Sequence, residues 1–382
     1  MMTRFFGSRF YSGFLLLLFF LMAAAASFNG FYTKWRLNDG HPSLGLSYMV
    51  EGTAARPYVY RQLLPAMANQ IQSLLPVAIL ARISSSLSDP RKINSRSSLA
   101  MKYPESEALK PAVALRYYIV YYLTFFALVA SLYVMRRLCL RVGATEPAAI
   151  AAPAIMALLL PFMLTEGGYF YDFTEVLFIM SAVTLALGVE TLRSWRALLL
   201  LVLAGLATWN KEAFFWFTPA LYPLLRAHLD RIRAAGLVSA LMLAGGCVYL
   251  AMRLRYAGNP GSTVDFQLWD NLLFYADPGN WFRTENTYGV LLPRGFSLVF
   301  VLVFAGLGVK AWRRLPATLR VHGATAAAIN LPLFLLFCSP GEMRNLSMLY
   351  PTLTLLIACA LSAWLSMPAR SGPAGRGTEA AD

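Results

Sequence analysis

Charged residues are scarce in this sequence. Asp, Glu, Lys and Arg together make up 14% of the 382 residues, whereas hydrophobic residues make up 58% and the mean hydropathy is +0.54. A soluble domain is normally about a quarter charged and about half apolar. The shortage of charge excludes a disordered chain, a coiled coil and an ordinary soluble enzyme, and it indicates an all-α polytopic membrane protein.

Cysteine and histidine are also sparse. The four cysteines lie in or at the edge of apolar runs, and no pair has the spacing of metal ligands. The three histidines are scattered, and His228 and His322 fall on the expected cytoplasmic side. These patterns exclude a disulfide scaffold and predict neither a cofactor nor a metal, with a divalent cation held by carboxylates as the alternative.

A glycine-rich phosphate loop is missing, and the cytoplasmic turns are too short for a nucleotide-binding domain. A nucleotide-sugar donor is therefore not expected. The formal net charge of +14 does not indicate nucleic acid here, because cytoplasmic loops of membrane proteins collect Lys and Arg.

Ten apolar runs follow one another along the chain. A helix needs about 20 residues to cross the hydrocarbon core. The first run, 14–28, follows Arg4 and Arg9, and we interpret it as an uncleaved signal-anchor in preference to a cleaved signal peptide. The other nine lie near 113–135, 147–164, 173–189, 197–209, 213–225, 234–252, 295–312, 322–338 and 346–366.

Two of these runs, 197–209 and 213–225, are short and flank the polar sequence Trp209–Glu212. They form either two short spans or one interrupted helix, and the second alternative would invert every later segment. With ten spans and a cytoplasmic N-terminus, every cytoplasmic turn is basic, whereas the outer turn 165–175 contains three acids and no base. The positive-inside rule therefore favours about ten spans with both termini cytoplasmic.

Two outer segments are long. Within the first, 30–112, apolar residues recur at three- and four-residue steps over about 61–83, which predicts an amphipathic helix on the outer membrane surface with a kink at Pro76. Residues 84–110 are expected to form a mobile loop. The second outer segment covers about 253–294. The expected plan is a single transmembrane domain over 1–367 and a disordered cytoplasmic tail over 368–382.

Ionisable residues are almost missing from the centres of the runs, where a coupled transporter usually needs them. Polar residues gather instead at the expected outer ends and loops, several beside aromatic residues. There they either anchor the protein at the membrane surface or converge on one outward-facing cavity. The set comprises Asp39, Glu51, Arg56, Arg61, Glu166, Asp172, Glu175, Lys211, Glu212, Glu342 and Arg344, with Tyr60 and Tyr171 next to them.

A cavity of this kind suits a lipid-linked phosphate. Arginine and lysine bind phosphate, a nearby carboxylate can deprotonate a hydroxyl group, and apolar walls admit a lipid tail. These residue types alone leave a sugar transferase and a phospholipid-modifying enzyme as alternatives.

The order of the predicted segments and one sequence motif resemble those of a known class of membrane proteins. A first span, a large outer loop with an acidic residue, an amphipathic helix and a multi-span bundle resemble the GT-C class of membrane glycosyltransferases. Residues 56–65, Arg-Pro-Tyr-Val-Tyr-Arg-Gln-Leu-Leu-Pro, look like the PFxYRxLxP signature of bacterial membrane proteins with this layout. The sequences at 171–173, 211–212 and 342–344 resemble further polar positions of such proteins.

The resemblance implies an enzyme of the bacterial inner membrane that moves a sugar from a polyprenyl-phosphate-linked donor to a glycan, glycolipid or protein acceptor at the outer face. It implies a catalytic carboxylate in the first outer loop, for which Asp39 and Glu51 are the candidates. The substrate-binding candidates are Arg56, Arg61, Lys211 and Arg344 for the donor phosphate, and Tyr60, Tyr171, Glu166, Asp172, Glu212 and Glu342 around the sugar and those cations.

Three other functions remain as alternatives. A surface-polysaccharide polymerase or ligase would share the lipid-linked substrate and differ in the length of its product. A lipid or polysaccharide transporter would need structural repeats and a polar path through the bundle. A non-catalytic membrane subunit would tolerate alanine at Asp39 and Glu51.

Overall fold

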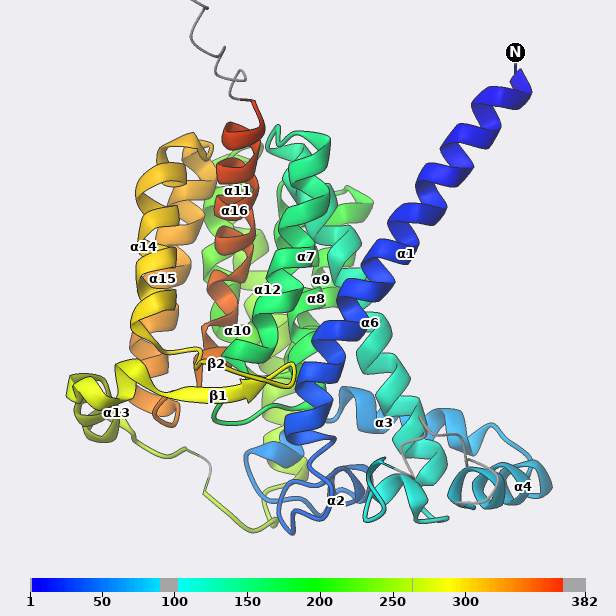
Figure 1. The fold of residues 1–382 in the computed structure, drawn as a ribbon. Coiled ribbons are helices and arrows are strands. Elements are labelled where there is room, and N and C mark those ends of the chain that lie inside the picture. Colours follow the sequence, from blue (N-terminus) through cyan, green and yellow to red (C-terminus); the bar gives the residue numbers. More distant parts are fainter. Residues whose placement is uncertain (1, 90–101, 263, 367–382) are drawn as a thin grey trace, which may run out of the picture.

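The computed structural model describes residues 2–89, 102–262 and 264–366, and most of them are helical (Figure 1). The expected tail over 368–382 and part of the expected loop over 84–110 lie outside these residues. Within them, six segments are long and apolar enough to cross a membrane, which supports the predicted helical, multi-pass membrane protein. They are Ser12–Trp35 in α1 (Met2–Trp35), α6 (Ala114–Arg141), α7 (Glu146–Met163), α12 (Arg231–Arg255), α15 (Ala317–Phe337) and Met343–Leu365, which joins η6 (Met343–Leu349) to α16 (Tyr350–Leu365).

The other four predicted runs are also helical but shorter. They run alongside the long helices in Figure 1. Each is shorter than the roughly 20 residues of a typical span. They are α8 (Phe170–Ala186), α9 (Trp195–Asn210), the continuous segment α10 (Ala213–Phe217), η3 (Thr218–Leu221) and α11 (Tyr222–Leu225), and α14 (Leu298–Ala311).

The helices on either side of the polar break after α9 are two antiparallel arms rather than one interrupted helix. At the start of α9, Arg196 Nη1 donates to the carbonyl of Gly188, just beyond the end of α8, at 2.6 Å. At the other end of α9, Lys211 Nζ lies 3.3 Å from Asp172 Oδ1, in the first turn of α8. The following arm returns, and its residue Ala220 contacts the first turns of α15 through its carbonyl.

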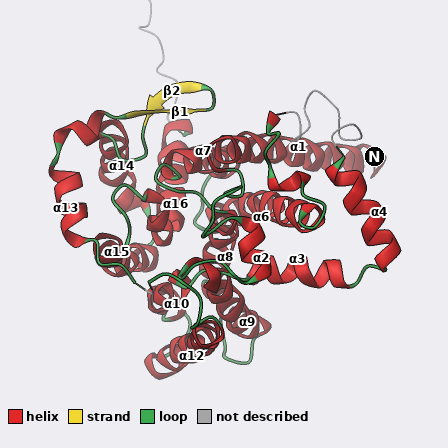
Figure 2. Cartoon of the chain, turned by 90° about the horizontal axis from the view of Figure 1, so that it is seen from below, coloured by secondary structure: helices red, strands yellow, loops and turns green. Residues whose placement is uncertain are grey.

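Short helices of the segment between α1 and α6, which was expected to be the first outer loop, lie across one end of the bundle. They are α2 (Leu46–Glu51), η1 (Tyr58–Tyr60), α3 (Leu63–Ser73) and α4 (Val77–Ser88), followed by η2 (Glu107–Leu109) before α6. Figure 2 shows α3 and α4 beside α6, with which both are in contact. The predicted amphipathic helix over 61–83 is present as two helices, because Pro76 cannot continue α3 and instead stands directly before α4. Leu74 and Val77 at this junction are strongly exposed.

The second outer segment contains elements that the sequence did not predict. Helix α13 (Leu268–Ala276) and η4 (Pro278–Phe282) precede an antiparallel hairpin of β1 (Thr284–Thr287) and β2 (Val290–Pro293), in which Thr284 pairs with Pro293. The two-residue turn Tyr288–Gly289 has positive φ at both positions, which is typical of a tight hairpin. Helix α13 lies at the edge of the bundle away from α4 (Figure 2), and it exposes Trp269 and Leu273.

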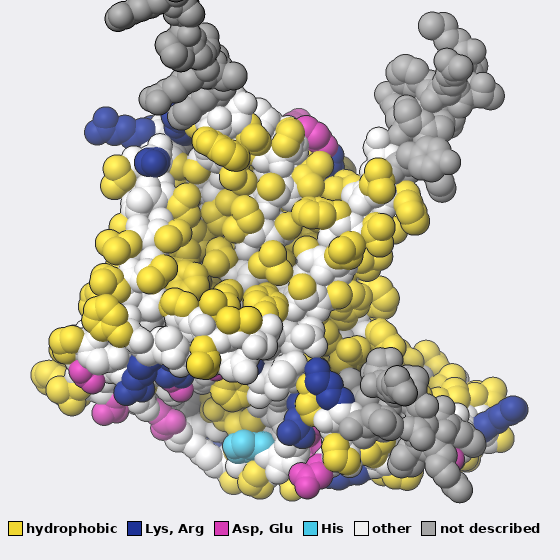
Figure 3. Space-filling view, in the orientation of Figure 1, with side chains coloured by type: hydrophobic (Ala, Val, Ile, Leu, Met, Phe, Trp, Pro, Cys, Tyr) yellow, Lys and Arg dark blue, Asp and Glu magenta, His cyan; other side chains and the backbone are white. Residues whose placement is uncertain are grey.

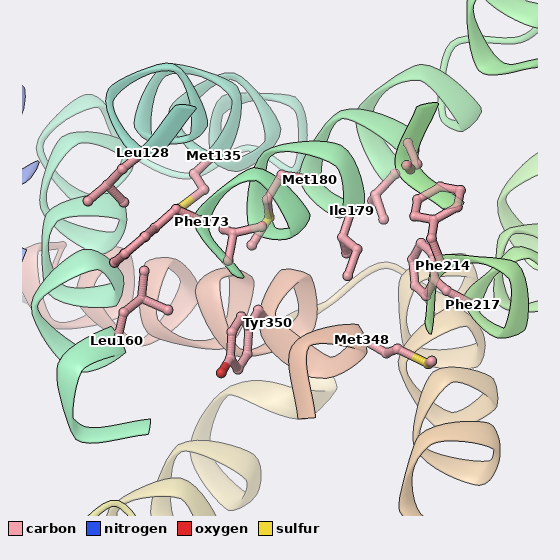
Figure 4. Packing of buried hydrophobic residues seen from close by; sticks show 14 of the residues in the cluster. Leu128, Met135, Leu160, Phe173, Ile179, Met180, Phe214, Phe217, Met348 and Tyr350 are labelled. Carbon is pink, nitrogen blue, oxygen red and sulfur yellow. The ribbon is translucent and has the colours of Figure 1, made fainter. Parts of the chain in front are cut away.

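The core of the bundle lies among α6, α7, α8 and α16. Large apolar side chains from these helices meet in Figure 4. The outside of the bundle is apolar as well: Figure 3 shows hydrophobic side chains over its middle and charged side chains towards its two ends. Leu198 and Leu302, for example, are each 63% exposed. A large apolar surface of this kind is expected where lipid rather than water surrounds the protein.

Gly295, between the hairpin and α14, packs against the end of α7. A Cβ atom at this position would lie 2.0 Å from the carbonyl oxygen of Phe162, and Tyr288 holds the same hairpin by donating to the carbonyl of Leu158 at 3.0 Å. We expect Gly295→Ala to lower the free energy of unfolding by about 1–3 kcal/mol because the backbone must shift. Thermal unfolding in detergent measures the loss of stability. The control is Gly306→Ala on α14, where an added Cβ atom would meet no other atom within 4 Å. Equal midpoints for the two variants would contradict the tight contact.

Candidate functional site

A buried ionic network lies where the polar break after α9 meets the start of α8. Lys211 Nζ is 2.6 Å from Glu175 Oε2 and 3.3 Å from Asp172 Oδ1, and all three side chains are less than 10% exposed. Ser347 Oγ donates to the other oxygen of Glu175 at 2.7 Å. A buried charge needs such partners, because removal from water disfavours the ionised form.

Asp172 connects this lysine to Arg344, which precedes α16. Arg344 Nη1 donates to Asp172 Oδ1 at 3.1 Å, and Nη2 donates to Glu342 Oε1 at 2.9 Å. The second oxygen of Asp172 accepts from the backbone N–H of Tyr169 at 2.9 Å in a capping box at the start of α8. This placement suits a carboxylate, because the N-terminal end of a helix carries partial positive charge.

Arg61 and Glu212 form a second ion pair next to the first. The guanidinium donates from Nε to Glu212 Oε2 at 3.0 Å and from Nη2 to Oε1 at 2.6 Å, and its Nη1 donates to the Tyr171 hydroxyl. Burial is the largest influence on the Glu212 carboxyl and would raise its pKa, but Arg61, Lys211 and a backbone hydrogen bond together hold that pKa below its ordinary value.

Tyrosine rings pack around the two arginines. Tyr169 and Tyr171 stack with centroids 5.0 Å apart, and Tyr58 stacks on Tyr169 at 5.5 Å. The guanidinium carbon of Arg344 lies 4.4 Å from the centroid of Tyr169, and that of Arg61 lies 4.8 Å from the centroid of Tyr171. These cation–π contacts fix the two guanidinium planes.

The network is almost neutral by itself. The cations Arg61, Lys211 and Arg344 meet four carboxylates, which leaves a formal charge of −1. Each cation is therefore already paired within the protein. These pairs hold α8, the break after α9 and the segment before α16 in one arrangement.

A cavity of about 330 Å³ adjoins the network. Its polar wall contains both charged and aromatic side chains. Its apolar wall comes mainly from α10 and α15, and Trp216 and Phe337 on this wall are 45% and 44% exposed. The side chains that shape the cavity include Tyr60, Arg61, Lys211, Glu212, Trp216, Tyr249, Arg253, Asp265, Leu333, Phe334, Phe337, Glu342 and Arg344.

The structure brings together most of the candidates taken from the sequence. Tyr171 and Asp172 contact the cavity wall through Arg61 and Arg344. Four polar segments that are far apart in the sequence therefore meet at one place. The candidates that line the cavity directly are Tyr60, Arg61, Lys211, Glu212, Glu342 and Arg344.

Three other candidates lie elsewhere. Glu166 pairs with Arg294 beside the hairpin. Arg56 Nη2 donates to the carbonyl of Gly261 at 2.6 Å and ties the first outer loop to the second. Glu51 is exposed and lines a different depression beside α3. None of these three is among the described residues that line the cavity.

Asp39 also lies apart from the cavity, in a hydrogen-bonded group at the start of α6. Its Oδ2 accepts from Ser106 Oγ at 2.6 Å and from the Tyr117 hydroxyl at 3.1 Å. Its Oδ1 is buried without a hydrogen-bond partner among the described residues. Burial raises the pKa of Asp39, although the two hydroxyl donors oppose this shift.

The raised pKa of Asp39 predicts a pH effect that Asp39→Asn removes. Above the folded-state pKa the buried carboxylate costs stability, and this cost disappears as the pH falls through that pKa. We therefore expect the wild type to gain stability relative to Asp39→Asn on acidification from about pH 7.5 to about pH 4. Thermal midpoints of both proteins in detergent measure the difference. If the thermal midpoint of the wild type decreased relative to that of Asp39→Asn on acidification, the result would contradict the burial of this carboxyl.

Sequence reasoning missed two charged residues of the cavity, Arg253 and Asp265. Arg253 is in the last turn of α12, where an arginine looks like an ordinary membrane-surface cation. Asp265 follows a glycine-rich turn in a loop whose path the sequence does not reveal. Across the described residues, no group of three or more His, Cys, Asp and Glu side chains is placed to hold a metal ion.

No protein-family model matches the sequence. No significant match was found among curated proteins or among solved structures. A functional assignment therefore depends on the residues and geometry of the cavity.

Proposed function

We propose that this protein is a GT-C-like glycosyltransferase of a bacterial inner membrane, with ten spans and both termini cytoplasmic. It would move a sugar from a polyprenyl-phosphate-linked donor to a glycan, glycolipid or protein acceptor at the outer face. The observation that supports this proposal is the cavity itself, because one wall is charged and aromatic while the other is apolar and includes the exposed side chains of Trp216 and Phe337. A lipid-linked sugar has the same two parts.

The two walls of the cavity would contact different parts of the substrate. The lipid chain would enter from the bilayer along Trp216, Leu333 and Phe337, where its burial is favourable. The sugar would meet Glu212 and Glu342, whose carboxylate oxygens accept hydrogen bonds from hydroxyl groups. Tyr60 and Tyr249 provide flat apolar faces with polar edges on the same side.

The transfer needs one base. The acceptor oxygen forms a bond to the anomeric carbon, the bond from that carbon to the phosphate oxygen breaks, and the lipid phosphate leaves with the electron pair. The acceptor proton passes to a carboxylate within hydrogen-bond reach. We assign this role to Asp265, because Glu212 and Glu342 are each bound by an arginine, whereas the contact of Asp265 is with Ser262 at 2.6 Å.

Asp39 and Glu51, the carboxylates expected from the resemblance, do not line the cavity. A base outside the cavity is not within reach of an acceptor that reacts inside it. In this proposal Asp39 supports the first outer loop, and Glu51 belongs to the outer surface.

Mass spectrometry of the lipid-linked and surface glycans tests the function. We expect a deletion strain to lack one defined sugar and the wild-type gene to restore it. Collapse of glycan chain length would instead favour a polymerase or ligase. Unchanged masses of every glycan would contradict an enzyme of glycan assembly.

A further inference from the structure

Arg253 has an unusual position among the cations of the cavity. Its guanidinium carbon lies 4.9 Å from the ring centroid of Tyr249 and 5.9 Å from that of Tyr60. Its Nε is buried and has no hydrogen-bond partner in the described parts of the chain. No carboxylate of residues 2–89, 102–262 or 264–366 is within ion-pair distance of it.

The other three cations of the cavity differ from Arg253 in this respect. Arg61 is held by Glu212, Lys211 by Asp172 and Glu175, and Arg344 by Asp172 and Glu342. A ligand anion would have to compete with a carboxylate for any of them. Binding at Arg253 requires no such exchange.

We propose that Arg253 binds the phosphate of a lipid-linked substrate, with Tyr249 and Tyr60 holding its guanidinium at the cavity wall. This inference deepens the proposed function and rests on it. It transfers the phosphate-binding role to a residue at the end of α12, from the four cations for which the sequence suggested it: Arg56, Arg61, Lys211 and Arg344.

The side chains around Arg253 favour a phosphate group in this part of the cavity. A guanidinium offers parallel N–H donors that match two phosphate oxygens, and aromatic rings hold its plane without occupying those donors. The network around Lys211 has a formal charge of −1, so an anion is stabilised at the Arg253 side rather than among Glu212 and Glu342. The apolar wall with Trp216 and Phe337 belongs to the same cavity and would take the lipid chain.

Binding of three probes to the full-length protein in a neutral detergent tests this site. The probes are farnesyl phosphate, farnesol without the phosphate, and inorganic phosphate without the lipid. The variant is Arg253→Gln. The control is Arg255→Gln, because Arg255 lies at the same helix end but stacks on Tyr256 and faces the depression beside α3.

We expect Arg253→Gln to weaken farnesyl phosphate binding at least tenfold, as the loss of charge-assisted hydrogen bonds requires. Arg255→Gln should bind like the wild type, and farnesol should not distinguish the three proteins. Inorganic phosphate that competes as well as farnesyl phosphate would support the anion site and make free phosphate its ligand.

Two results would overturn the inference. One is that Arg253→Gln binds farnesyl phosphate as tightly as the wild type does. The anion would then bind elsewhere, and the proposed transferase function would still stand. The other is a wild type that binds farnesyl phosphate no better than farnesol. Conversely, binding that depends on Arg253 together with unchanged cellular glycans would retain this site and refute the proposed transferase.

Discussion

Lys211→Met should destabilise the protein by about 3–5 kcal/mol, which is the usual effect of removing one partner of a buried ion pair. Methionine fills a similar volume but leaves Glu175 buried without its cation, since the remaining partner of that carboxylate is the hydroxyl of Ser347. Asp172 keeps Arg344 and the N–H of Tyr169. Thermal unfolding in detergent should therefore show a large decrease of the midpoint.

Two further variants make this prediction specific. Lys310→Met removes the same charge from an exposed position in the last turn of α14 and should leave the midpoint nearly unchanged. Glu175→Gln added to Lys211→Met should restore much of the lost stability, because the uncompensated charge is gone. Equal midpoints for Lys211→Met and Lys310→Met would show that the network does not stabilise the fold.

Asp265→Asn should lower the rate of sugar transfer by about 10²–10⁴-fold, the usual contribution of a general base. The amide has nearly the same size as the carboxylate but cannot take the acceptor proton. Because Asp265 is exposed on a loop, its replacement should leave the thermal midpoint unchanged. Transfer of label from a radioactive polyprenyl-phosphate sugar to an acceptor in membranes measures the rate at matched protein levels.

Asp270→Asn is the matched control, because Asp270 is an exposed aspartate in the first turn of α13 and does not line the cavity. It should transfer sugar at the wild-type rate. If Asp265→Asn were fully active while Asp39→Asn or Glu51→Gln was inactive, the base would belong to the first outer loop, as the resemblance implied.

The sequence predicted the helices well because apolar runs and basic turns are local signals. It predicted one kinked helix over 61–83, whereas the structure has two helices, α3 and α4, with Pro76 directly before the second. The choice between two arms and one interrupted helix around Lys211 required tertiary contacts, since the polar break is compatible with both. The β1–β2 hairpin was missed because its strands are only four residues long and lack an alternating pattern.

The candidate site was predicted in part for a similar reason. Arg61, Lys211 and Arg344 stand out because they lie in the short polar motifs 56–65, 211–212 and 342–344, and the structure does bring them together. Their partners could not be assigned, since pairing depends on how α8, α9 and α16 pack. Arg253 and Asp265 carry no local signal, and only the folding of the second outer segment over the cavity gives them a role.

Photo-crosslinking tests whether the cavity beside Lys211 and Arg253 receives the lipid-linked substrate. The full-length protein in membranes would be irradiated with a polyprenyl phosphate that carries a diazirine in its lipid chain, and the labelled peptides would be identified by mass spectrometry. We expect labelling of the apolar wall around Trp216 and Phe337, and we expect excess unlabelled polyprenyl phosphate to prevent it. Labelling confined to the outer faces of α1 and α14, unaffected by the competitor, would contradict it.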